Sequence, residues 1–188
     1  MIYISTDFVF DGSKNTPYLE TNKTNPRGIY GSTKLQGEEV IKSALKKYFI
    51  IRTSWLYSEY GNNFVKTMLR FGKERDKLSV VNDQKGTPTY AGDLAKVILK
   101  VIETNNSDFG MYHYSSKGVT TWYEFAKEIF EERKISIDIK PIRTEEYPTA
   151  AERPKYSALD TSKIKRVFDI EIPFWKKSLK KALKNINK

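Results

Sequence analysis

The chain has 188 residues, of which 39% are hydrophobic and 13% aromatic; this composition excludes a disordered chain and predicts one folded domain, or one and a half small ones. It contains no cysteine and one histidine, which excludes disulfides and thiolate metal sites and argues against a zinc site, so we expect no bound metal. The formal net charge of +10 raises the question of an anionic partner.

Short runs of β-forming residues alternate with helical stretches along the chain. Buried or alternating runs predict strands over residues 2–5, 49–52, 78–81, 111–114 and 135–142. Apolar residues at helical spacing predict helices over residues 32–46, 64–72, 91–103 and 122–133. The last of these follows a capping box, in which Thr121 stands three residues before Glu124. Strands that alternate with helices predict an α/β fold with a parallel sheet.

A final helix is predicted at the basic C-terminus. Nine basic and two acidic residues lie between Lys163 and Lys188, which accounts for +7 of the net charge. Apolar residues recur there at helical spacing, at Trp175, Leu179, Ala182, Leu183 and Ile186. Pro173 suits the first turn, and the lysines form the solvated outer face of a docked helix. The alternative is a patch for nucleic acid or membrane. Because no basic motif with interleaved aromatic residues supports it, we expect neither partner.

The N-terminus shows no targeting signal. Met1 leads directly into the first strand without a basic leader, and no apolar run approaches the length of a membrane span. Together with the lack of cysteine, this predicts a soluble protein of the reducing cytoplasm.

Two groups of polar residues indicate proton transfer at a carbonyl. Tyr30 and Lys34 form a Tyr-x-x-x-Lys pair, whose spacing on a helix places both side chains on one face. An ammonium beside a phenol favours the phenolate, which suits acid–base chemistry; a chance surface pair is the alternative. Thr6 and Asp7 follow the first strand, where open α/β sheets place ligands and where a hydroxyl can donate to a carbonyl oxygen. A plain turn or helix cap is the alternative for these two residues.

These residues lie in segments that match a known family. The matching segments, in chain order, are residues 5–12, 25–26, 30–38, 52–57, 63–65, 83–90 and 153–154. On these segments the chain resembles the dTDP-4-dehydrorhamnose reductase family, within the extended short-chain dehydrogenase/reductases, over nearly its whole length. The Tyr-x-x-x-Lys pair is typical of the whole superfamily, whereas the segments around Trp55 and Gln84 are more specific.

The resemblance implies a role for each residue of the two polar groups. Tyr30 would be the general acid that protonates the C4 oxygen as hydride arrives from the nicotinamide. Lys34 would hold the nicotinamide ribose and support Tyr30. Thr6 would hydrogen-bond the substrate carbonyl, and Asp7 would lie beside the sugar.

Three further residues are expected to contact substrate by the same resemblance. Trp55 matches a substrate-contacting position, with a core tryptophan as the alternative. Gln84 and Arg153 fall in segments that border the nucleotide-sugar pocket in such enzymes. A guanidinium at Arg153 has the two-pronged geometry to pair with a diphosphate.

The reaction implied is reduction of the 4-keto group of dTDP-4-dehydro-L-rhamnose to dTDP-L-rhamnose by NADPH or NADH. Related sugar-nucleotide 4,6-dehydratases carry a glutamate after Thr-Asp, whereas Phe8 follows Thr6 and Asp7 here, which favours reduction over dehydration. A non-catalytic sugar-nucleotide-binding or regulatory subunit is the alternative function.

The fold implied is the C-terminal part of a Rossmann-like parallel sheet plus a smaller α/β substrate-binding region. We expect residues 1–61 to supply strands and helices of the Rossmann-like domain, and residues 62–188 mainly the substrate-binding region, with some segments returning to the sheet. None of the ten glycines forms a G-x-G-x-x-G motif. We therefore expect the cofactor-binding half to be missing, through truncation, fragmentation or a split pair, and a separate N-terminal half or a second copy of the chain to be a partner.

Overall fold

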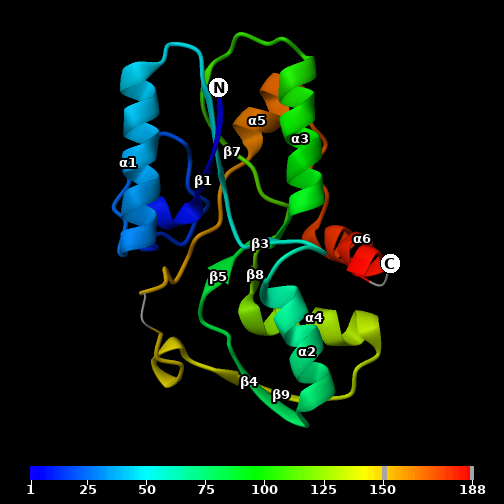
Figure 1. Cartoon of the computed structure of the whole chain (residues 1–188). Helices are drawn as coiled ribbons and strands as arrows, with labels where there is room; N and C mark the ends of the chain where they lie inside the picture. The colour runs from blue at the N-terminus through cyan, green and yellow to red at the C-terminus, as the bar shows by residue number, and fades with distance from the viewer. Residues whose placement is uncertain (150–151, 187–188) are drawn as a thin grey trace.

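A parallel sheet of three strands lies at the centre of the structure, a computed structural model that describes residues 1–149 and 152–186. Its order is β1 (Ile2–Thr6), β2 (Phe49–Thr53) and β7 (Gly110–His113) (Figure 1). All residues of the middle strand are buried, which explains its apolar run. The register places Thr6 beside Thr53 and Arg52 beside His113, so the carboxyl ends of the strands meet at one edge.

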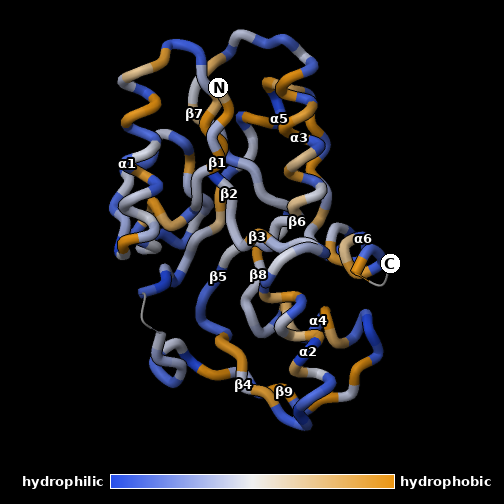
Figure 2. The backbone as a smooth tube through the Cα atoms, in the orientation of Figure 1, coloured by the Kyte–Doolittle hydropathy of each residue, from blue (hydrophilic) through white to orange (hydrophobic). Residues whose placement is uncertain are grey.

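Helices cover both faces of this sheet. α1 (Ile29–Ala44) lies on one side, and α3 (Ala91–Glu103) and α5 (Ser162–Phe168) lie on the other (Figure 1). Apolar and polar colours alternate along α1 and α3 (Figure 2), as expected for helices with one face on a core. The core under α3 and α5 contains Phe49, Ile51, Leu94, Val97, Val101, Tyr112, Ile164 and Phe168.

A smaller α/β region lies below the sheet in Figure 1. In it β4 (Lys77–Val81) pairs in parallel with β9 (Asp138–Ile142), and α4 (Trp122–Arg133) packs against both strands and against α2 (Phe64–Glu74). α6 (Trp175–Ile186) packs on α4. The remaining elements are the two-residue strands β3 (Leu56–Tyr57), β5 (Lys85–Gly86), β6 (Thr89–Tyr90) and β8 (Thr120–Thr121), and the single turns η1 (Asp7–Val9) and η2 (Thr144–Glu146).

The predicted α/β fold, with a Rossmann-like parallel sheet and a smaller α/β region, is confirmed. The helix over residues 91–103 has the predicted bounds, and Thr121 caps α4 by accepting a hydrogen bond from the Glu124 amide at 3.2 Å. α3, β7 and α5 lie beyond residue 62; β7 is the third strand of the sheet, and the two helices pack on it. The division between residues 61 and 62 stays a prediction.

Some predicted boundaries are wrong. α1 begins at Ile29, three residues early, and β9 begins at Asp138, three residues late. Pro173 precedes α6 and is not in its first turn, because the chain before Trp175 is held by backbone bonds to Lys117. α5 has no predicted counterpart because seven residues give only two turns of periodicity.

The basic face of α6 is partly paired with carboxylates. Its apolar side is buried as predicted, with Trp175, Leu179, Ala182 and Leu183 in the core. Three lysines meet acidic partners on neighbouring helices: Lys176 with Glu128, Lys180 with Glu132, and Lys181 with Asp93. Within the part of the chain that the structure describes, no helix is long and apolar enough to cross a membrane.

Candidate functional site

Thr6 and Asp7 lie at the carboxyl edge of the sheet, where the chain turns from β1 into η1. The Thr6 hydroxyl accepts a hydrogen bond from the Phe8 amide at 3.2 Å and donates one to Asp7 Oδ1 at 3.0 Å. Both side chains are buried. Thr6 therefore acts as the cap that the sequence left open as an alternative, and its contact with a substrate carbonyl stays a prediction.

Tyr30 and Lys34 project from the start of α1 beside this turn. α1 approaches η1 closely because residue 31 is glycine; a Cβ there would lie 2.2 Å from the Phe8 carbonyl oxygen. The Tyr30 ring meets the Phe8 ring edge-on, with centroids 6.0 Å apart, and is 57% exposed. The Lys34 ammonium lies 4.2 Å from the centroid of the Tyr3 ring in β1. The predicted phenol and ammonium thus come from residues one turn apart on α1; Tyr30 is exposed, and Lys34 is half-buried.

A buried ion pair anchors α1 to the sheet. Glu38 lies one turn beyond Lys34 and is fully buried, as is Arg52 in β2. Arg52 donates from Nε and Nη2 to the two carboxylate oxygens at 2.8 and 2.6 Å, and the Ser5 hydroxyl donates to Glu38 Oε1 at 2.5 Å. This bidentate contact fixes the rotation of the helix that carries Tyr30 and Lys34.

The role of this pair was not predicted from the sequence, although a signal was present. An arginine inside an apolar strand requires a buried carboxylate partner, and Glu38 repeats the helical spacing of Tyr30 and Lys34. Arg52 also lies beside His113, whose ring is buried; burial first, and the Arg52 charge second, lower the pKa of His113 to about 3, so this histidine is neutral.

Asp7 is the most strongly perturbed acid at this edge. Burial raises the pKa of Asp7 from 3.8 to about 7, against the opposing effect of the nearby Ser157 and Thr6 hydroxyls. Its Oδ2 has no hydrogen-bond partner among the described residues. The folded chain therefore keeps a proton on Asp7 that an unfolded chain releases near pH 4.

Asp7→Asn is expected to stabilise the chain at high pH and to leave its stability unchanged at low pH. Between pH 3.8 and about 7 the folded state binds the extra proton, so stability falls as pH rises. The difference between the pKa of Asp7 in the folded and in the unfolded chain corresponds to about 4 kcal/mol of stability that is lost at high pH. A neutral amide at this position does not lose it. The free energies of unfolding of the unchanged chain and of Asp7→Asn are measured in urea at about pH 4 and about pH 8. Asp76→Asn, at an exposed position, is the control. An Asp7→Asn advantage that does not grow with pH would contradict the prediction.

Trp55 follows β2 at the same edge of the sheet. Its side chain is half-buried and stacks on Trp122 at the start of α4, with ring centroids 3.5 Å apart and planes 7° apart. Trp55 is thus not enclosed in the core, and its contact with substrate stays a prediction.

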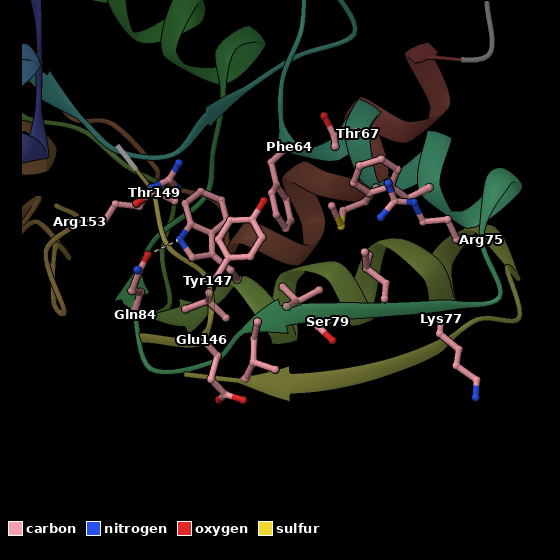
Figure 3. A pocket seen from close by; sticks show the side chains of 17 residues that line it. Phe64, Thr67, Arg75, Lys77, Ser79, Gln84, Glu146, Tyr147, Thr149 and Arg153 are labelled. Carbon is pink, nitrogen blue, oxygen red and sulfur yellow. Dashed lines mark hydrogen bonds between the residues drawn. The ribbon is translucent and has the colours of Figure 1, made fainter. Parts of the chain in front are cut away.

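Gln84 and Arg153 line a cavity of about 740 Å³ in the smaller region. Gln84 is buried, and its Oε1 accepts a hydrogen bond from Trp122 Nε1 at 3.1 Å (Figure 3). Its Nε2 donates to Thr144 Oγ1 at 3.1 Å. Arg153 is exposed and lies with Gln84 at one end of the cavity, whereas Arg75 and Lys77 lie at the other (Figure 3).

The structure divides the predicted residues between two places. Thr6, Asp7, Tyr30 and Lys34 share the sheet edge; Gln84 and Arg153 share the cavity. The cavity has three basic residues and one acidic residue, Arg75, Lys77, Arg153 and Glu146, so it suits an anion. Trp55 connects the two places through Trp122.

Four aromatic residues line the cavity, and none was predicted as a site residue: Phe64, Phe71, Trp122 and Tyr147. Phe64 and Trp122 are the first residues of α2 and α4, and their rings lie 4.7 Å apart. Asn63 and Thr121 cap the two helices, of which only Thr121 was predicted, and a cap indicates where a helix begins but not that two rings meet.

This chain is similar to proteins of one family. The family model described as RmlD substrate binding domain matches residues 1–188. The dTDP-4-dehydrorhamnose reductase of Escherichia coli (strain K12) is 43% identical over 195 residues, which cover 99% of this chain and 65% of that protein.

Solved structures give the same result. A crystal structure of a dTDP-4-dehydrorhamnose reductase from Clostridium acetobutylicum matches with a TM-score of 0.94 at 45% identity, over 100% of this chain and 66% of that one. The enzyme from Bacillus anthracis str. Ames, in complex with NADP, matches with a TM-score of 0.92 at 44% identity, over 98% and 64%. The chain spans 65% of the length of the curated relative from E. coli.

Proposed function

The chain belongs to the family of the RmlD substrate binding domain, and from this premise we propose that it forms the substrate-binding and proton-donating part of a reductase. The substrate proposed is dTDP-4-dehydro-L-rhamnose, the product is dTDP-L-rhamnose, and the reductant is NADPH or NADH. The observation that carries the proposal is the placement of Tyr30 and Lys34 one turn apart at the start of α1, with Tyr30 exposed, beside the carboxyl end of β1.

The chain's own residues supply the proton and orient the sugar. The Tyr30 hydroxyl transfers its proton to the C4 oxygen of the substrate, and the ammonium of Lys34 stabilises the phenolate that remains. Thr6 directs its hydroxyl to the same oxygen when its hydrogen bond to Asp7 is exchanged. A nicotinamide dinucleotide, when bound, supplies the hydride at C4.

The residues present fit the reactive end of such a cofactor. Lys34 and Tyr30 offer an ammonium and a hydroxyl to the ribose, and the edge around them is open. No glycine-rich phosphate loop occurs in the 188 residues, so we propose that a segment like the remainder of the longer relatives holds the pyrophosphate. β1 pairs only with β2 among the described strands, and its other edge is where that segment, or a second copy, would add.

The cavity of the smaller region is proposed to hold the nucleotide. Phe64 offers an aromatic face to a base, and Arg75, Lys77 and Arg153 offer positive charge to a diphosphate. Trp55 lies between this cavity and the sheet edge, where the sugar would reach Tyr30.

Calorimetric titration of the 188-residue chain with dTDP-L-rhamnose tests the proposal. We expect saturable binding, and a loss of about tenfold or more in affinity for Arg153→Ala, because a charged hydrogen bond is removed. Exposed Arg166→Ala in α5 is the matched control and should bind as the unchanged chain does. Absence of binding by a cooperatively unfolding chain would reject the proposed function.

Turnover separates the enzyme from a non-catalytic binding subunit. NADPH consumption with dTDP-4-dehydro-L-rhamnose is measured on the chain alone and on the chain joined to the N-terminal part of the C. acetobutylicum relative. We expect turnover only in the joined protein. Ligand binding without turnover in the joined protein would favour the binding subunit.

A further inference from the structure

The backbone of Trp55 adopts a conformation that a bulky residue rarely takes. Its φ is +45°, in the left-handed region that suits glycine and disfavours aromatic side chains. Such strain persists only where the surrounding structure holds it, and it is common at ligand-binding positions. The contacts that hold the Trp55 ring therefore bear on function.

Two neighbours determine where the Trp55 indole lies. Trp122 stacks on it with planes only 7° apart. Gly86 in β5 packs closely against the indole; a Cβ at that position would lie 2.5 Å from Trp55 Cε2. The indole thus has a flat aromatic support and a backbone contact that admits no side chain.

Trp122 is itself held from three directions. Its ring packs on Phe64, its Nε1 donates to Gln84, and its backbone begins α4 directly after the Thr121 cap. Gln84 cannot rotate freely, because its other end donates to Thr144. Thr144 in turn donates to a carboxylate oxygen of Asp83 at 2.6 Å. A continuous set of contacts therefore runs from η2 through Gln84 and Trp122 to Trp55.

We propose that Trp122 is a positioning residue for Trp55, and through it a determinant of sugar recognition. Trp122 sets the plane of the Trp55 indole, and Gln84 fixes the rotation of Trp122. The inference rests on the proposed function in one respect, that Trp55 faces the sugar of a bound dTDP-sugar. It assigns the affinity effect of Trp122 to the stack with Trp55, and not to a separate contact with the nucleotide.

A double-mutant cycle distinguishes these two actions. The affinity for dTDP-L-rhamnose is measured by calorimetry for Trp55→Leu, Trp122→Leu and the double variant. We expect each single change to lower the affinity by about tenfold, and the double change to lower it by no more than about tenfold as well, since both remove the same support. Losses that multiply to about a hundredfold would overturn the proposal.

Matched variants exclude a general loss of packing. Tyr123→Leu alters the next residue of α4, in the same core, and should keep the affinity. Trp122→Phe retains a stacking face but not the hydrogen bond to Gln84, and should restore most of the affinity that Trp122→Leu loses. Equal losses in Trp122→Phe and Trp122→Leu would contradict an action through stacking.

A spectroscopic signature tests the positioning without any ligand. Two stacked indoles should give an exciton-coupled circular-dichroism signal from their strong far-ultraviolet transition, which disappears in Trp55→Leu and Trp122→Leu, weakens in Gly86→Ala and stays in Tyr123→Leu. If the unchanged chain binds no dTDP-L-rhamnose, the proposed function fails. The dichroism signal then still tests whether Trp122 positions the Trp55 indole. Persistence of the signal in Trp122→Leu, or its absence in the unchanged chain, would overturn it.

Discussion

Tyr30→Phe is expected to lower turnover of dTDP-4-dehydro-L-rhamnose by about 10²–10⁴-fold and to leave the affinity for dTDP-L-rhamnose nearly unchanged. The change removes only the hydroxyl, which is the proposed proton donor, and keeps the ring contact with Phe8. The expected loss corresponds to about 3–5 kcal/mol of transition-state stabilisation. Because Tyr30 is exposed, no change in folding should accompany it.

The measurement uses the chain joined to a dinucleotide-binding segment, with kcat and ligand affinity determined separately. Tyr60→Phe is the matched control, since Tyr60 is also exposed and lies outside the proposed site. Unchanged kcat in Tyr30→Phe would remove Tyr30 from the role of proton donor. An equal loss in Tyr60→Phe would point to a nonspecific effect.

Arg52→Met is expected to lower the free energy of unfolding by about 3–5 kcal/mol, because it leaves the Glu38 carboxylate buried without its cation. Ser5 alone would remain as a partner of that carboxylate. The double variant Glu38→Leu, Arg52→Met removes both charges and should lose less stability than the single one. Since α1 carries Tyr30 and Lys34, the single variant should also lower turnover in the joined protein.

Urea unfolding measures these stabilities, and a surface pair in the same helix provides the comparison. Glu39 and Lys42 form an exposed ion pair in α1, and Glu39→Gln should change stability by less than about 1 kcal/mol. If the double variant were less stable than Arg52→Met, the prediction would be wrong. Replacing the ion pair by apolar residues would then cost more than leaving the Glu38 carboxylate without its cation.

The sequence predicted local features of the site well. The spacing of Tyr30 and Lys34 suits one helix face, and α1 contains both, although the predicted helix began only at residue 32; Thr6 directly follows the predicted first strand. Thr121 and Glu124 mark the start of α4 without any tertiary information. These features depend on residues only a few positions apart.

The contacts that shape the site depend on residues far apart in the chain. Gln84 meets Thr144 60 positions later, and Trp122 meets Trp55, so no local pattern announces them. The two-residue strands exist only because distant segments pair, as Gly86 does with Thr120. The buried state of Asp7 could not be foreseen either, since it depends on the packing of the chain around Ser157.

The position of α6 has a consequence for how the site works. Its Ser178 and Lys181 both bond Asp93 of α3, beside the sheet, at 2.6 Å. On the same helix, Lys176 and Lys180 pair with Glu128 and Glu132 of α4 in the smaller region. A hinge motion between the two parts would have to break contacts on one side of this helix. α6 therefore bridges the sheet and the smaller region, and its contacts with α3 and α4 oppose such a motion.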